Sequence, residues 1–291
     1  MPIIYRKTQM WCASLVFAIA GAGIFFSGAA NAQATDPAFT IGVLPNVSAR
    51  VILQNYQPMR AFFERELKRK VEIATASDFR SFSAATFRGE YQMVVTAANL
   101  GRVAQLDAGW EAIAVYEPAI PGLLVAGSEN ANASVEQLRG KSLALANPQS
   151  LVALRGLQWL RAQGMQDGRD FKIVLAGNDD SLGTLIRSGE APMAIMSMGE
   201  FRQIGEATRK NLKIVQEFAK VPGFLVMVNP QLGAAERSRI KTLALQFAAS
   251  EDGKKFSMLT GVANIRDVTE AELTPLDEFT VQTRAGLGIT K

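Results

Sequence analysis

The order of apolar and polar positions after residue 38 predicts alternating strands and helices. Short apolar runs rich in β-branched residues are typical of buried strands, and apolar residues spaced by three or four positions are typical of helices. Pro58, which is favourable in a first helical turn, opens a stretch in which Met59, Phe62, Phe63 and Leu67 share one face. The expected strands are 39–44, 71–74, 91–96, 110–116, 142–146, 171–175, 192–197, 212–218 and 222–228.

The expected helices fall between these strands and after the last of them, at 81–88, 98–106, 150–163, 181–187, 200–210, 235–249 and 251–259. A strand–helix–strand order implies parallel strands with helices on the faces of the sheet. We therefore predict an α/β fold of two lobes, each a mainly parallel sheet flanked by helices.

The two lobes imply two chain crossings, expected near 120–126 and 217–225. They give a first lobe of 33–122 and 220–291 and a second lobe of 123–219. A cleft between two such lobes is a preferred place for a small-molecule site, and hinge closure around the ligand is the expected motion.

Residues 1–32 have the pattern of an export signal. Arg6 and Lys7 are followed by an uncharged apolar run, 10–26, and then by the A-x-A sequence 30–32. This combination indicates a secretory signal peptide that is cleaved after Ala32 and exports the mature chain. The alternative is an uncleaved anchor, although the run is only marginally long enough for a bilayer, which needs about 20 apolar residues.

The composition removes several classes of function. The 291 residues include no His, which excludes Ser-His-Asp and Cys-His catalysis and imidazole-ligated metals. The one Cys, Cys12, precedes the predicted cleavage site, so the mature chain has neither a disulfide nor a thiol nucleophile. No P-loop, Ser-Lys pair or carboxylate pair has a supporting context, so we expect neither an enzyme nor a cofactor. The net charge of +4 implies no nucleic-acid partner.

Several short segments occur in an informative order: 41–46 (IGVLPN), 56–58 (YQP), 75–79 (TASDF), 138–141 (LRGK) and 221–223 (VPG). Together they resemble the periplasmic phosphonate/phosphite/phosphate-binding proteins of ABC transporters, over essentially the whole mature chain. The resemblance implies a type II periplasmic binding-protein fold, in which two α/β lobes joined by a hinge trap a ligand. At the ligand-contacting positions the chain departs from the family, because 147–151 reads NPQSL in place of a hydroxyl-rich turn and Phe79 replaces the Tyr of an Asp-Tyr pair.

The candidate binding residues follow the expected strands, because ligands of open α/β sheets bind beyond the carboxyl ends of the strands. Gln149 and Ser150 precede an amphipathic helix, whose free N–H groups and dipole suit an oxyanion. The alternative is that Ser150 only caps this helix. The full candidate set is Asn46, Ser77, Asp78, Phe79, Ala98, Asn99, Gln149, Ser150, Asn178, Asp179 and Ser197.

Other members of this set also have structural alternatives. Asn46 suits a turn, and Ala98 and Asn99 suit the start of a tightly packed helix. A carboxylate at Asp179 would accept an amine or a polyol rather than a bare anion, and the alternative is that it or Asp180 caps a helix near 181.

We expect a monomeric periplasmic solute receptor that delivers a small polar or anionic solute to an ABC permease. Neutral donors rather than an arginine clamp would hold an anionic solute. The alternative function is a ligand-sensing partner of a membrane histidine kinase. A copper(I) site at Met193, Met196 and Met198 is disfavoured, because no His or Cys joins them and Met is a common core residue. We therefore expect no metal.

Overall fold

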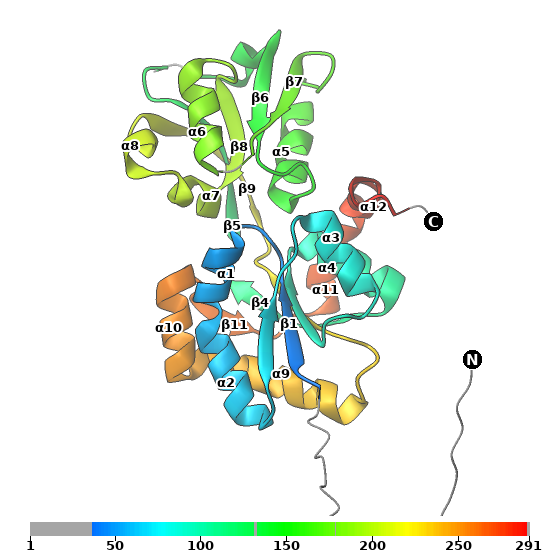
Figure 1. Ribbon diagram of the computed structural model, residues 1–291. Helices are drawn as coiled ribbons and strands as arrows, with labels where there is room; N and C mark the ends of the chain where they lie inside the picture. The colour runs from blue at the N-terminus through cyan, green and yellow to red at the C-terminus, as the bar shows by residue number, and fades with distance from the viewer. Residues whose placement is uncertain (1–36, 131–132, 178, 290–291) are drawn as a thin grey trace, which may run out of the picture. The chain divides into compact units, whose positions relative to one another are not determined.

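The computed structural model describes residues 37–130, 133–177 and 179–289 (Figure 1). Residues 37–291 form one compact unit. The predicted signal peptide, 1–32, lies outside the described residues. Among the helices that are described, none combines the length and the apolar character needed to cross a membrane.

The first sheet is six-stranded, in the order β11-β4-β10-β3-β1-β2. β1 pairs in parallel with both β2 and β3, whereas β10 runs antiparallel to β3 and β4, and β11 runs antiparallel to β4. The strands are β1 (Phe39–Val43), β2 (Val71–Ala74), β3 (Met93–Thr96), β4 (Glu111–Glu117), β10 (Leu225–Val228) and β11 (Asn264–Arg266).

The second sheet is five-stranded, in the order β7-β6-β8-β5-β9. β6 pairs in parallel with β7 and β8, whereas β5 runs antiparallel to β8 and β9. The strands are β5 (Ile120–Gly127), β6 (Lys141–Leu145), β7 (Phe171–Leu175), β8 (Met193–Ser197) and β9 (Leu212–Val221).

The predicted α/β fold is correct, but each sheet is mixed rather than mainly parallel. The cause is the pair of connections between the sheets. The chain passes from β4 directly into β5 and returns from β9 directly into β10. β5 and β10 therefore enter their sheets from the end opposite to the neighbouring parallel strands, and each runs against them.

These connections also orient the parallel strands. β4 has the same direction as β3, because both run antiparallel to β10, and β4 leads into the second sheet. β9 has the same direction as β8, because both run antiparallel to β5, and β9 leads back into the first sheet. The carboxyl ends of β1–β3 and of β6–β8 therefore face the junction between the sheets.

The helices mostly follow the expected pattern, and the main differences lie late in the chain. The expected helix 200–210 is divided at Gly205, and no element was expected over 264–287, where the structure has β11 and further helical turns. The helices are α1 (Ala49–Asn55), α2 (Gln57–Leu67), α3 (Phe79–Phe87), α4 (Ala98–Ala108), α5 (Leu151–Ala162), α6 (Asp179–Ser188), α7 (Met198–Gln203), α8 (Glu206–Arg209), α9 (Ala234–Ala249), α10 (Glu251–Thr260), α11 (Glu270–Leu273) and α12 (Thr280–Leu287), with 3-10 turns η1 (Val135–Leu138) and η2 (Thr274–Phe279).

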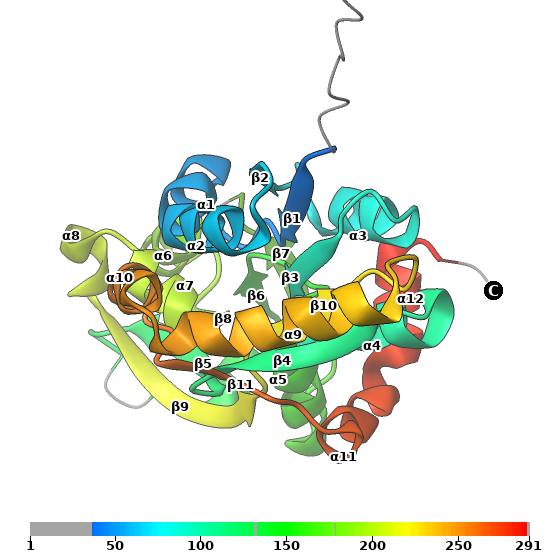
Figure 2. The ribbon, with the colours of Figure 1, turned by 90° about the horizontal axis from the view of Figure 1, so that it is seen from below.

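Helices cover both faces of the first sheet. Successive strand residues point to opposite faces, so neighbouring residues of one strand belong to different clusters. Met93 and Val95 of β3 belong to a cluster with residues of α1, α2, α9 and α10, whereas Val94 belongs to a cluster with residues of α3 and α4. Figure 2 shows α3 and α4 on the other side of the first sheet from α1 and α2. The cluster around Val94 continues through η2 and α12 to α5, which packs on the second sheet. One hydrophobic cluster therefore includes residues of both sheets.

Candidate functional site

Two sets of loops lie at the carboxyl ends of the parallel strands. The first loop set, residues 44–48, 75–78 and 97–99, lies at the ends of β1, β2 and β3 and includes the first two residues of α4. The second loop set, residues 146–150, 176–177 and 197–198, lies at the ends of β6, β7 and β8 and includes the last residue of β8 and the first of α7. Because neighbouring parallel strands end at the same edge, the loops within each set are neighbours, as the hydrogen bond from the Thr75 hydroxyl to the Val43 carbonyl (2.8 Å) illustrates.

The two loop sets meet at Asn99 and Gln149. The side-chain amide of Asn99 donates to the backbone carbonyl of Gln149 at 3.0 Å. It also donates to the Thr283 hydroxyl, on α12, at 3.1 Å. The structure thus brings together two residues that the sequence analysis proposed independently, one from each loop set.

Asn99 has a buried acceptor without a partner. The residue is only 1% exposed, and its Oδ1 accepts no hydrogen bond from the residues that the structure describes. The orientation of the carboxamide is defined, because the Gln149 carbonyl can only accept and must therefore face the Nδ2 hydrogens. Leaving such an acceptor unsatisfied costs about 1–3 kcal/mol, which a hydrogen-bond donor at this point would recover.

The segment 147–150 is held by its own hydrogen bonds. The Asn147 side chain accepts from the Gln149 N–H at 2.9 Å, and the Asn147 carbonyl accepts from the Ser150 N–H at 3.2 Å. The Ser150 hydroxyl caps α5 by accepting from the Ala153 N–H at 3.1 Å. The capping alternative for Ser150 is therefore observed, while a part for Ser150 in binding stays a prediction.

In the first loop set, Asp78 is a helix cap. Its carboxylate accepts from the Ser81 N–H at 2.7 Å and from the Ser77 hydroxyl at 2.8 Å. These hydrogen bonds, that from the Ser81 N–H foremost, hold the pKa of Asp78 below its ordinary value. Phe79 is buried in the core and Asn46 is exposed in the loop after β1, so neither contacts Asn99 or Gln149 through a hydrogen bond of the described residues.

Ala98 lies in the first turn of α4, preceded by the N-cap residue Ala97. Alanine has no side-chain acceptor, so no side chain of the N-cap satisfies the first N–H groups of this helix. Both alanines are buried, at 7% and 1% exposure. The close packing expected as the alternative for Ala98 is observed.

The remaining candidates lie in the second loop set or next to it. Ser197 caps α7, and it forms a reciprocal capping box in which the Glu200 N–H donates to its hydroxyl at 3.1 Å. α6 begins at Asp179, two residues before the expected start, while Asn178 lies outside the described residues. Burial raises the pKa of Glu200.

The sequence analysis missed two residues of α12 that form hydrogen bonds with Asn99 and Gln149. Thr283 accepts from Asn99, and the Gly286 carbonyl accepts from the Gln149 side chain at 2.8 Å. One sequence signal for helical structure in this region was available. Thr269 and Glu272 have the Thr-x-x-Glu spacing of a capping box, which marks the start of α11.

The loop sets are neutral apart from Asp78, because they contain neither Lys nor Arg. Within the described part of the chain, no group of His, Cys, Asp and Glu side chains could hold a metal ion. Met193 and Met196 are buried in the core. The loop sets themselves therefore offer N–H, hydroxyl and amide donors to a solute, while Arg80 of α3 lies beside them and donates at 3.2 Å to the Gly286 carbonyl that also accepts from Gln149.

Residues 41–273 match the family described as "ABC transporter, phosphonate, periplasmic substrate-binding protein". This match spans both sheets and both loop sets. The chain belongs to this family. Its members are periplasmic solute-binding proteins that bind small anionic solutes and work with the permease and ATPase components of ABC importers.

Solved structures have the same fold at low sequence identity. A binding protein component of an ABC phosphonate transporter from Pseudomonas aeruginosa has a TM-score of 0.73 at 13% identity, covering 86% of this chain and 89% of that chain. PhnD1 from Prochlorococcus marinus, in complex with methylphosphonate, has a TM-score of 0.73 at 12% identity, covering 87% and 99%. The periplasmic aliphatic sulphonate-binding protein SsuA from Escherichia coli has a TM-score of 0.62 at 12% identity, covering 87% and 94%.

These comparisons confirm the α/β fold with two mixed sheets and the family that the sequence motifs indicated. The protein is a periplasmic substrate-binding protein of an ABC importer that captures a small anionic ligand. The alternative of a histidine-kinase partner receives no support from the family or from the solved structures.

Proposed function

We propose that this chain captures a small phosphonate-type oxyanion at the junction of the two loop sets. The ligand would lie between the two lobes expected from the sequence, 33–122 with 220–291 and 123–219. The chain crosses between the sheets at 118–119 and 222–224, so residues 120–122 and 220–221 lie in the second sheet rather than in the first lobe. The mature protein, cleaved after Ala32, would act as a monomer and present the ligand to the permease of its importer. The family description and the methylphosphonate complex of PhnD1 support this ligand class.

The observation that carries the proposal is the contact between Asn99 and Gln149. It joins the carboxyl ends of the parallel strands of both sheets, where ligands of such sheets bind. The neutral character of the loops fits a solute that is held by hydrogen bonds, since such donors stabilise an oxyanion when most of its acceptors are satisfied.

The helix N-termini at the junction differ in their suitability for an anion. α3 already has the Asp78 carboxylate at its N-terminus, which would repel a second anion. α4 is preceded by Ala97 and α5 by the neutral hydroxyl of Ser150, so the positive ends of these dipoles carry no compensating charge. We therefore expect the oxyanion at the first turns of α4 and α5.

The unpartnered Oδ1 of Asn99 favours a ligand that brings a donor. A monoprotonated phosphonate has a P–O–H group, whereas a sulfonate has only acceptors at neutral pH. A phosphonate bound against this oxygen satisfies it, whereas a sulfonate there leaves it unsatisfied at a cost of about 1–3 kcal/mol. The proposal therefore includes a preference for methylphosphonate over methanesulfonate.

The test is a thermal-shift and calorimetric titration of residues 33–291 with methylphosphonate, phosphite, phosphate and methanesulfonate. Methylphosphonate should bind and, at 100 times its dissociation constant, raise the free energy of unfolding by about 2.7 kcal/mol. Methanesulfonate at the same concentration should give a smaller shift. The proposed ligand class would be contradicted if none of the four compounds gave a thermal shift or a binding heat, or if methanesulfonate bound more strongly than methylphosphonate.

A further inference from the structure

The segment 270–287, which comprises α11, η2 and α12 and is called here the C-terminal clasp, contacts elements that pack on both sheets. It follows β11 of the first sheet, and its apolar residues Leu276, Phe279 and Leu287 belong to the cluster that α5 shares. Its polar contacts include one group toward α4 of the first sheet and one toward α5 of the second, and its last turns contact the candidate site.

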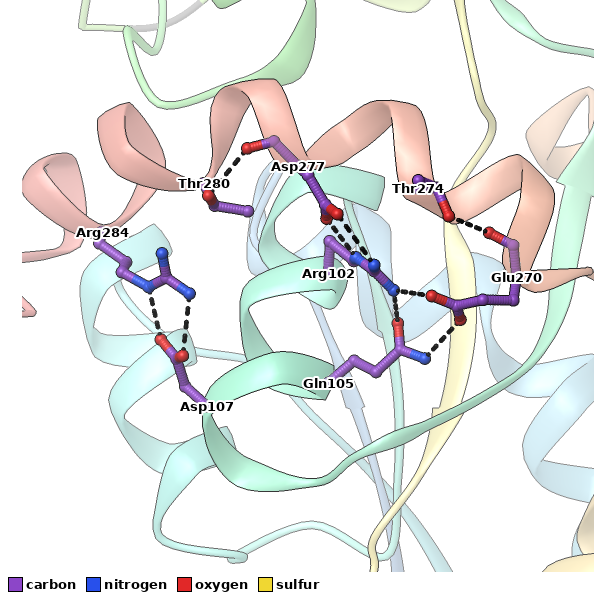
Figure 3. Close-up of polar contacts among 8 residues, drawn as sticks. All are labelled: Arg102, Gln105, Asp107, Glu270, Thr274, Asp277, Thr280 and Arg284. Atoms are coloured by element: carbon purple, nitrogen blue, oxygen red, sulfur yellow. Dashed lines mark hydrogen bonds and ion pairs between the residues drawn. The ribbon is translucent and has the colours of Figure 1, made fainter.

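Toward α4, the clasp is anchored by arginine–carboxylate pairs, in which Arg102 is buried while Asp277 and Glu270 are exposed (Figure 3). Arg102 is only 5% exposed, and its guanidinium donates to both oxygens of Asp277 at 2.6 and 3.2 Å and also to Glu270. At the other end, Arg284 makes a bidentate pair with Asp107 at 2.7 and 2.9 Å. Bidentate arginine–carboxylate pairs fix orientation as well as distance, so the clasp is held in one register along α4.

Toward α5, the clasp presents Glu278 and Phe279. One oxygen of Glu278 pairs with Arg155 at 2.8 Å, and the other accepts from the Gln158 side chain at 3.0 Å. The Arg155 guanidinium carbon also lies 4.6 Å from the centre of the Phe279 ring, a cation–π contact. A charged, hydrogen-bonded and aromatic contact therefore joins the clasp to the helix that follows the second loop set.

The last turns of the clasp reach the candidate site itself. Thr283 accepts from Asn99, and the Gly286 carbonyl accepts from Gln149 and, at 3.2 Å, from Arg80 of α3. The approach at Gly286 is close, because a Cβ added there would lie 2.7 Å from Cγ of Gln149. A glycine at this helical position therefore permits the contact that holds the Gln149 side chain.

We propose that the C-terminal clasp sets the separation of the two loop sets, with Glu278, Thr283 and Gly286 as positioning residues for Asn99 and Gln149. The clasp is fixed to α4 and holds α5 through Glu278 and Phe279. When the contacts of Glu278 with α5 are lost, the second sheet therefore moves over a wider range relative to the first. The inference deepens the proposed function, since it assigns control of closure to residues outside the loop sets. It does not depend on the ligand class.

The experiment measures the distance between the sheets without any ligand. Because the only cysteine of the chain, Cys12, precedes the predicted cleavage site, Ala61→Cys on α2 and Lys172→Cys on β7 give the mature protein a unique pair of spin-label sites at exposed positions. Double electron–electron resonance then measures the distribution of distances between the two spin labels. Glu278→Ala should shift and broaden this distribution.

Two further variants make the result decisive. Gly286→Ala places a better helix former in α12 but displaces Gln149, so it should also shift the distribution while leaving the melting temperature unchanged or higher. Glu251→Ala removes an exposed carboxylate of α10 that pairs with Lys254, and it should leave the distribution unchanged. Wild-type distributions in both Glu278→Ala and Gly286→Ala would overturn the proposal, and a binding test that finds no phosphonate would not.

Discussion

At the scale of single residues, the structure shows why polar residues after strands are ambiguous in the sequence. Asp78, Ser150 and Ser197 were all proposed to contact ligand, and all three cap the helix that follows them. A helix cap and an anion site use the same free N–H groups, so the residue type and its place after a strand are identical for both roles. Only the hydrogen-bond partners distinguish them.

The cap at Ser150 gives a stability prediction. Ser150→Ala removes the acceptor for the Ala153 N–H and should lower the free energy of unfolding by about 1 kcal/mol, measured by urea denaturation. Ser48→Ala is the matched control, because Ser48 is the N-cap residue of α1 and makes no side-chain capping bond. Equal free energies for the two variants would show that the Ser150 hydroxyl contributes nothing as a cap.

At the scale of elements, the helices with strong apolar periodicity were predicted and the C-terminal turns were not. α2, α4, α5 and α9 lie within a few residues of their expected bounds, because a continuous apolar face identifies each. α11 and η2 are too short to show such a face in the sequence, although Leu273, Leu276 and Phe279 are buried in the shared cluster. The capping box of Thr269 and Glu272 was the one local signal in that region.

Glu272 gives this region a pH-dependent contribution to stability. Its pair with Arg266 and its bonds to Thr269 lower its pKa from 4.5 to about 2. Because the folded pKa lies below the unfolded one, the ionised carboxylate stabilises the fold above about pH 4.5, and this contribution is lost as the pH falls toward 2. The side chain is 39% exposed, so solvent screening reduces the effect.

Glu272→Gln should therefore be less stable than the wild type at pH 6, with the difference shrinking between pH 4.5 and pH 2. Chemical denaturation at a series of pH values measures it. Glu251→Gln, another carboxylate whose pKa is lowered by a lysine of its own helix, serves as a comparison on α10. A stability difference that stays constant down to pH 2 would contradict the assigned role of the Arg266 pair.

At the scale of the whole described unit, the two sheets share a hydrophobic cluster. It extends from α3 and α4 through the C-terminal clasp to α5 and the second sheet. Sheets with entirely separate cores could unfold independently, whereas a shared core couples their unfolding. The loop sets themselves are joined by polar contacts, such as the hydrogen bond between Asn99 and Gln149.

The mature chain should therefore unfold in one cooperative transition. Trp110 is buried beside the first sheet, and Trp159 stacks on Phe218 of the second sheet at a centroid distance of 5.5 Å. In Trp159→Phe and Trp110→Phe, each remaining tryptophan reports on one sheet. For each variant, the urea midpoint measured by the fluorescence of the remaining tryptophan should coincide with the midpoint measured by far-ultraviolet circular dichroism. Two separate midpoints within one variant would indicate independent lobes.

The sequence by itself determined the α/β class, most strands and long helices, the family, and the places where binding residues were to be sought, because each depends on local periodicity or on short contiguous motifs. The tertiary structure decided which of those residues meet. Asn99, Gln149 and Thr283 come from distant parts of the chain, and no local pattern records that contact. The directions of β5 and β10 likewise follow from where the chain crosses between the sheets, a property of its path through space rather than of any one segment.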